Sequence, residues 1–299
     1  MSTLSAPRTV SLKELVPENV IILVVGPTGS GKSSFISQAS GIQDDIVGHD
    51  LVSKTSEILA VKYTDEESGL DIVLVDTPGL SNTLKDDSEV LRMFTEWSRK
   101  LKKRDLVISG ILYFHRISDN RIPANPLRAL CVFGEPCGGL GAALSKTILT
   151  ITMWNDVGDE IGEKRLVELK STFWKVVLKY MNDVESAREL IREVIRSRGG
   201  QHQGAMPKQD MALTVQERSR QDLLKNLETL TERQLAILRN IDEESRNTSD
   251  PNAPASRGEL EREYEKLRLQ MDEAWRQLCQ TNKWSPPPKT PTKRRFFPR

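Results

Sequence analysis

Eight residues near the start of the chain, GPTGSGKS at 26–33, have the residue types and spacing of a phosphate-binding loop (P-loop). An apolar run, residues 20–25, precedes them, and a segment typical of a helix follows. Small residues let successive backbone N–H groups turn toward an anion, and the helix N-terminus favours the same negative charge. We expect phosphates to bind to Gly26, Pro27, Thr28, Gly29, Ser30, Gly31, Lys32, Ser33 and Ser34.

Two side chains of this loop and two residues of a second motif would carry the chemistry. Lys32 would reach the β- and γ-phosphates of a nucleotide, and the Ser33 hydroxyl would bind Mg²⁺. The second motif, LDIVLVDTPGL at 70–80, places an acid at the end of another apolar run. Asp76 would hold Mg²⁺ through water, and Gly79 would let the backbone approach the γ-phosphate because glycine has no side chain.

Together the two motifs resemble the GTPase branch of the P-loop NTPases, over about residues 20–200. GPTGSGKSS followed by DTPGL is most similar to the septin, Toc and AIG1 (immunity-associated) GTPases, and phrases such as FHRISDNR resemble fungal G-domain proteins. The stretch VGHDLVSKTSE at 47–57 is similar to the first switch of that group. The resemblance implies that Thr55, or as second choice Ser53, closes onto Mg²⁺ and the γ-phosphate.

The guanine-recognition motif of GTPases, Asn-Lys-x-Asp, is absent from its expected place, where the chain reads TMWND at 152–156. A carboxylate discriminates guanine because it accepts from both N1–H and the exocyclic amine. Asp156 could do so if the loop bulges, and Trp154 could stack on the base, although a tryptophan at a strand end also suits a core. The resemblance favours GTP and GDP as ligands, with an ATPase of the same superfamily as an alternative.

Hydrolysis of GTP should be slow. Small GTPases orient the attacking water with a glutamine after the glycine of this motif, and here Leu80 follows Gly79 and cannot form that hydrogen bond. His49 lies in the expected first switch, where an imidazole could position water or contact a phosphate; the alternative is an exposed loop histidine. Arg116 and Arg121 are candidates for stabilising charge, or ordinary structural arginines.

The segments that must position these residues alternate between strands and helices. Strands are expected at 20–25, 56–63, 72–75, 106–114 and 148–154, and helices at 35–39, 86–101, 126–133 and 162–180. This alternation predicts a three-layer α/β G domain of the P-loop NTPase class, with a mostly parallel sheet and one antiparallel edge hairpin. Because ligands bind at the carboxyl ends of such strands, Gly26, Asp76 and residues 115–119 should converge on one site.

The composition changes after residue 198. Apolar residues then recur at spacings of four and three, with a break at 247–258, which predicts an α-helical hairpin or coiled-coil arm. Its apolar stripes could pack on the G domain or pair with another chain. The expected organisation is a flexible N-terminal lead (1–18), the G domain (19–198), a linker (199–214), the helical hairpin (215–281) and a disordered basic Pro-rich tail (282–299).

Overall composition limits the classes of partner. The chain has 43 basic and 42 acidic residues, so bulk charge predicts neither nucleic acid nor membrane binding. Its three cysteines do not make a disulfide framework, and we expect a cytoplasmic protein without a signal peptide or membrane span. The segment 289–295 gives only weak support for membrane or nuclear-import contacts.

The resemblance also implies an assembly role. Septin-like and AIG1-like GTPases suggest a nucleotide-dependent homo-oligomer that forms through the G face or through the helical arm. The sequence therefore predicts a slow, Mg²⁺-dependent GTPase that acts as a switch or assembly module. The alternative is a scaffold that binds nucleotide structurally and works through its C-terminal helices.

Overall fold

The computed structural model describes residues 6–42, 58–79, 84–119, 130, 137, 140–170, 176–202, 215–246 and 253–281. Its strands are β1 (Arg8–Val10), β2 (Val20–Val25), β3 (Leu59–Thr64), β4 (Asp71–Asp76), β5 (Ile108–Arg116), β6 (Thr147–Thr152) and β7 (Val176–Lys179). Its helices are α1 (Lys32–Ser40), α2 (Leu84–Lys102), α5 (Leu140–Ser145), α6 (Asp159–Lys170), α7 (Val184–His202), α8 (Val215–Arg246) and α9 (Ala253–Thr281), with 3-10 turns η1 (Leu12–Glu14) and η2 (Trp154–Asp156).

The described strands form one sheet in the order β1-β3-β4-β2-β5-β6-β7. β4, β2, β5, β6 and β7 are parallel, whereas β3 pairs with β4, and β1 with β3, in the antiparallel sense. All six residues of β2, VIILVV, are buried, as expected of a central strand covered on both faces. The predicted mostly parallel sheet with an antiparallel edge hairpin is confirmed.

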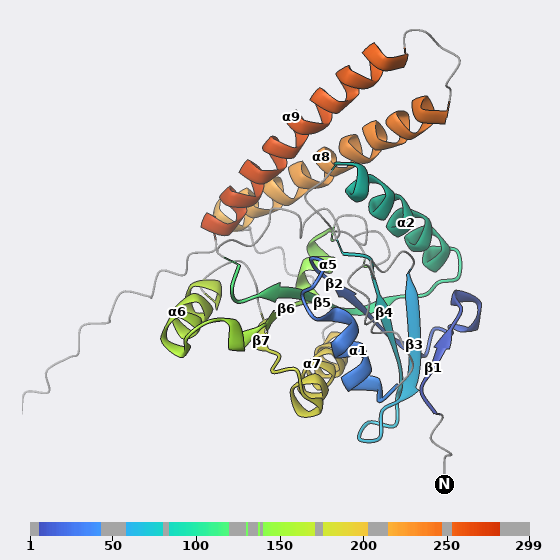
Figure 1. The fold of residues 1–299 in the computed structure, drawn as a ribbon, viewed down its shortest axis with the longest axis vertical. Coiled ribbons are helices and arrows are strands. Elements are labelled where there is room, and N and C mark those ends of the chain that lie inside the picture. The colour runs from blue at the N-terminus through green and yellow to red at the C-terminus, as the bar shows by residue number, and fades with distance from the viewer. Residues whose placement is uncertain are drawn as a thin grey trace, which may run out of the picture.

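Two apolar clusters fill the space on either side of the sheet. On one side α1 and α7 pack on the strands, where the Phe35 ring lies 5.3 Å from the Phe114 ring and 5.5 Å from the Tyr180 ring. On the other side the cluster takes in α2, α5 and both C-terminal helices. Figure 1 shows α8 and α9 as a hairpin beyond the sheet, and the two helices pack against each other.

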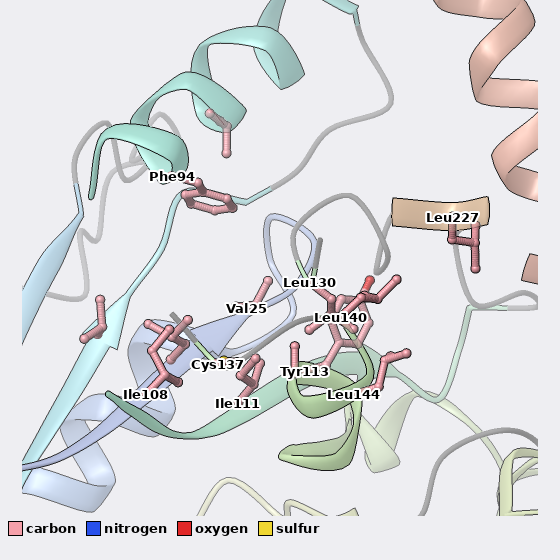
Figure 2. Close-up of a cluster of buried hydrophobic side chains, with 14 of the residues drawn as sticks. Val25, Phe94, Ile108, Ile111, Tyr113, Leu130, Cys137, Leu140, Leu144 and Leu227 are labelled. Carbon is pink, nitrogen blue, oxygen red and sulfur yellow. The ribbon is translucent and has the colours of Figure 1, made fainter. Parts of the chain in front are cut away.

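The hairpin docks on the G domain through α8. Leu227 is 0% exposed and belongs to the same cluster as Tyr113 of β5 and Leu140 of α5 (Figure 2). The neighbouring Glu228 accepts a hydrogen bond of 2.8 Å from the backbone N–H of Leu140, the first residue of α5. Of the two arrangements open for the apolar stripes, this chain buries them between α8 and α9 and against its own G domain.

Several boundaries differ from the sequence-based expectation. The helix expected at 162–180 ends at Lys170, and residues 176–179 instead form β7, which pairs with β6. Part of the lead expected to be flexible forms β1 and η1, because residues 8–10 hydrogen-bond with β3. These short segments gain their structure from a distant strand, so local periodicity does not reveal them.

A helix that was not predicted, α7, leads into the expected linker, and the helix after the hairpin break begins earlier than predicted. α7 continues through Gly199 and Gly200 to His202, and a glycine costs a helix only about 1 kcal/mol. α9 begins at Ala253 and includes Pro254, which a first helical turn tolerates because its N–H would be unpaired there. Residues 203–214 and 282–299 lie outside the described part, so the domain division stays a prediction. No helix among the described residues is long and apolar enough to cross a bilayer.

Truncation of the docking leucine should be costly. Leu227→Ala removes buried methyl groups from the contact between α8 and the G domain, which should lower the free energy of unfolding by about 2–5 kcal/mol. Urea denaturation followed by circular dichroism would measure it. Leu269→Ala, on α9 but 60% exposed, is the matched control and should change stability by less than about 0.5 kcal/mol. Equal effects of the two substitutions would contradict the docking.

Candidate functional site

The P-loop, residues 26–33, connects the buried end of β2 to the first turn of α1. Gly26 has a φ of 154°, and a Cβ placed on it would lie 2.6 Å from the carbonyl oxygen of Phe114. Any other residue would therefore have to push β5 away from β2. The Ser30 hydroxyl donates to the Pro27 carbonyl at 2.8 Å and closes the turn from inside. The loop is thus held tightly against the carboxyl ends of two central strands.

Lys32 is buried and folds back over this loop. Its Nζ donates to the carbonyl oxygens of Gly26, at 3.1 Å, and Pro27, at 3.0 Å. Burial lowers the pKa of Lys32 to about 8, and the nearby Asp76 carboxylate acts in the opposite direction. The ammonium group is therefore poorly compensated, and a phosphate would provide the negative charge that the loop carbonyls supply only in part.

Ser33 and Asp76, two of the three expected Mg²⁺ ligands, are brought together, whereas the third, Thr55, lies outside the described residues. The Ser33 hydroxyl donates to Asp76 Oδ2 at 2.8 Å, across the gap between α1 and the end of β4. Asp76 is only 1% exposed and its Oδ1 atom has no hydrogen-bond partner. Burial raises the pKa of Asp76, while Lys32 opposes that shift. A cation at this place would stabilise the ionised carboxylate.

These oxygen atoms fit Mg²⁺. That ion prefers hard oxygen ligands, is usually held by one or two carboxylates, and keeps several waters alongside substrate phosphates. The part of the chain that the structure describes contains no group of three or more His, Cys, Asp or Glu side chains able to hold a metal ion.

The DTPG segment after β4 lies against the P-loop. A Cβ placed on Gly79 would be 2.5 Å from the backbone nitrogen of Thr28, closer than real Cβ atoms approach. Thr77 fixes the segment further, because its buried hydroxyl donates to the Val24 carbonyl at 2.8 Å. The sequence analysis did not predict this role of Thr77. The available signal was a residue with a hydroxyl group directly after the strand.

The TMWND segment follows β6, which ends at Thr152 rather than at Trp154. The Trp154 indole N–H donates to the Ile151 carbonyl at 2.9 Å, and the Lys179 ammonium lies 4.3 Å from the ring centre. Asn155 and Asp156 are exposed on η2. The roles expected of Trp154 and Asp156 in base binding stay predictions.

β5 continues to Arg116, two residues beyond the expected strand, so His115 and Arg116 are its last two residues. His115 is buried, and burial lowers its pKa to about 4, so the imidazole is neutral at neutral pH. Arg116 forms an ion pair with Asp119 at 3.1 Å, which gives it a structural partner. The remaining candidates fall outside the described residues: His49, Ser53, Thr55, Leu80 and Arg121.

One family model matches the first part of the chain. Residues 21–122, about a third of the chain, match the family described as 50S ribosome-binding GTPase. No curated protein matches the chain. Among solved structures, a dimerization-deficient mutant of Toc33 from Arabidopsis thaliana shares 16% identity over 62% of this chain and 86% of its own, with a TM-score of 0.45.

Two further structures are similar at the same level. Aquifex aeolicus Era bound to GDP and AlF4⁻ shares 15% identity over 69% of this chain and 67% of its own, with a TM-score of 0.44. The cytosolic domain of the T. maritima FeoB iron transporter shares 14% over 87% and 96%, with a TM-score of 0.41. Likeness at this level carries no functional argument. The family match and the P-loop fold support a P-loop GTPase domain in this chain.

Proposed function

We propose that this chain is a Mg²⁺-dependent GTP-binding protein that hydrolyses GTP slowly and acts as a nucleotide-dependent switch or assembly module. The observation that carries the proposal is the convergence of Lys32, Ser33 and Asp76 at the P-loop, with one Asp76 oxygen buried and unpaired. Such an arrangement is unfavourable without a ligand. A bound nucleotide with its cation would satisfy all three groups.

The residues would act together in binding. Lys32 would exchange its two loop carbonyls for the β- and γ-phosphates, and the N-terminus of α1 would add its partial positive charge. Ser33 and Asp76 would hold Mg²⁺, which supplies positive charge to the phosphates when bound. Thr55 would complete this environment in the triphosphate state, and Gly79 would donate its backbone N–H to the γ-phosphate.

Loss of the γ-phosphate would release residues 44–56 and 79–88, an order–disorder switch. The cleavage itself would be slow because Leu80 cannot orient a water molecule, even if His49 contributes. Self-association through the G face or the helical arm would follow the nucleotide state. Sedimentation with and without a non-hydrolysable GTP analogue tests this, and identical profiles would exclude nucleotide-controlled assembly.

The deciding experiment compares nucleotides. We expect fluorescent GDP and a GTP analogue to bind at least about tenfold more tightly than ATP in the presence of Mg²⁺, a difference of about 1.4 kcal/mol. EDTA should weaken the binding of the GTP analogue most, because Mg²⁺ would supply positive charge to a ligand that carries more phosphate charge than GDP. The release of phosphate from GTP should be slow, and no phosphate should be released from the non-hydrolysable analogue. Equal or tighter ATP binding would overturn the guanine assignment while leaving the phosphate site intact.

Nucleotide affinity should also depend on pH. Burial lowers the pKa of Lys32 to about 8 in the free protein, and bound phosphates would raise it again. Between these two values the complex holds more protons than the free protein, so affinity should be constant below pH 8 and fall above it, by up to about tenfold per pH unit. Calorimetry at pH 9 in two buffers of different ionisation enthalpy should detect net proton uptake when GDP binds. If no protons were taken up on binding, the proposed contact between Lys32 and the phosphates would be wrong.

A further inference from the structure

Positive charge is concentrated where α2 ends. Five of the six residues at 99–104, RKLKKR, are basic, and all five are exposed. No ion pair joins Arg99, Lys100 or Lys103 to an acid in the described part of the chain. The negative end of the helix dipole favours cations here, but it is equivalent to only about half a unit charge. The cluster therefore carries more positive charge than the helix end can balance.

A second segment extends this charged surface. The Arg104 guanidinium donates to the carbonyl oxygens of Lys13, at 3.0 Å, and Leu15, at 3.2 Å, which holds η1 beside the end of α2 (Figure 1). We call the surface formed by residues 8–18 and 99–107 the basic pole. It carries seven basic and three acidic side chains, a net charge of +4, whereas the whole chain has a net charge of +1. The remainder of the chain is therefore net negative.

Two exposed valines belong to the basic pole. Val16 is 42% exposed and Val107 is 56% exposed. The Val16 N–H donates to Asn19 Oδ1 and the Asn19 N–H donates to the Val16 carbonyl, both at 3.0 Å, so Val16 lies on a closed turn. Val107 directly precedes β5. Single exposed valines are ordinary on a protein surface. These two, however, lie on fixed backbone within the most basic surface of the chain.

The basic pole lies at the end of the sheet opposite the P-loop. β5 begins at Ile108, which pairs with Ile21 near the beginning of β2, and the two strands are parallel. The P-loop follows Val25 at the other end of β2. Nucleotides would bind at the carboxyl ends of these strands. A partner that binds at the basic pole therefore leaves the phosphate site open.

We propose that the basic pole docks this protein on membranes that contain anionic phospholipids. Its lysines and arginines bind the headgroup phosphates, and Val16 and Val107 enter the boundary between headgroups and acyl chains. The composition favours a lipid surface over single-stranded nucleic acid, because residues 8–18 and 99–107 include no aromatic side chain on which a base could stack. Exposed valines also gain nothing from contact with a phosphate backbone. This docking is independent of the proposed nucleotide chemistry.

The charges are tested by sedimenting the full chain with lipid vesicles. We expect binding to vesicles of phosphatidylcholine and phosphatidylserine but not to phosphatidylcholine alone, and weaker binding as salt screens the charges. Each basic residue near an anionic surface is worth about fivefold in affinity, so Lys100→Gln combined with Lys103→Gln should weaken binding by about 10- to 30-fold. Lys164→Gln combined with Lys170→Gln changes two exposed lysines of α6, and with them the net charge, by the same amount. This control should stay within about twofold of wild type.

The valines are tested by their effect at constant charge. Val16→Ser combined with Val107→Ser should weaken vesicle binding by about three- to tenfold and leave its salt dependence unchanged. Val167→Ser combined with Val184→Ser is the matched control, at valines that are 66% and 42% exposed on α6 and α7. It should have no effect. Thermal unfolding followed by circular dichroism should give the same midpoint for all these variants, because their side chains are exposed.

Four outcomes would overturn the proposal. The first is equal binding to vesicles with and without phosphatidylserine. The second is unchanged binding after the Lys100 and Lys103 substitutions, which would assign the contact to another basic segment such as 289–295. The third is equal weakening by both pairs of lysine substitutions. The fourth is binding of RNA or DNA oligonucleotides, but not of vesicles, through the same two lysines.

Two further results separate the parts of the argument. Unchanged binding after both valine substitutions would show that insertion of the valines is wrong. A chain that bound anionic vesicles as expected but bound no nucleotide would refute the proposed function and support docking by the basic pole.

Discussion

Lys32→Ala should reduce the affinity for GDP and for GTP analogues by about 10²- to 10⁴-fold. The substitution removes a buried ammonium group that would make two charge-assisted contacts with phosphates, each worth about 1.5–3 kcal/mol. The affinity lost should be similar for guanine and adenine nucleotides, because the ammonium group would touch only phosphates. Isothermal calorimetry with Mg²⁺ present measures both.

A control separates the loss of a contact from the loss of the fold. Lys164→Ala changes an exposed lysine of α6 and should leave nucleotide affinity unchanged. Thermal unfolding should show that the Lys32→Ala protein still folds, since alanine removes a buried cation rather than a packed apolar group. Unchanged affinity in a folded Lys32→Ala protein would refute the site.

Gly79→Ala should discriminate between the two nucleotide states. Its new Cβ would meet the backbone nitrogen and Cα of Thr28 at 2.5 and 2.7 Å, and backbone atoms cannot rotate away as a side chain can. The DTPG segment would have to withdraw from the P-loop and would lose its hydrogen bond to the γ-phosphate. We expect the GTP analogue to bind about 10- to 100-fold more weakly, whereas GDP, which lacks that phosphate, should bind within about threefold of wild type.

The control for this prediction is Gly158→Ala. No atom lies within 4 Å of a Cβ at that position, so nucleotide affinity should not change. Competition against fluorescent GDP measures both variants under the same conditions. If Gly79→Ala weakened GDP as much as the GTP analogue, the strain would lie in the P-loop itself, and the proposed contact with the γ-phosphate would be wrong.

The phosphate end of the site could be predicted from sequence because its chemistry restricts residue types. A loop whose backbone must face an anion needs small residues at fixed spacing, and a buried strand must position that loop. GPTGSGKS directly after VIILVV therefore predicts a phosphate-binding loop. Asp76 followed from the same reasoning, and the structure brings it to Ser33 as expected.

The two strands that sequence reasoning missed depend on distant partners. β7 is four residues long, and Val176 becomes a strand residue by pairing with Ile148 of β6. Arg8 of β1 pairs with Lys62 of β3 in the same way. Nothing local marks these pairings. Likewise, the expected base-binding segment has no fixed backbone chemistry, so TMWND could be located in the chain but its contacts could not be predicted from the sequence.

Leu140 donates a hydrogen bond to Glu228, and Leu227 is buried. Through these contacts the helical hairpin packs against the hydrophobic core of the G domain. A chain shortened to residues 1–214 would lose the part of this apolar cluster that α8 and α9 supply. Its first α5 N–H would lose its carboxylate partner at the same time. The seam that composition suggests near residue 199 is therefore a poor place to cut this protein, because the two halves share one interior.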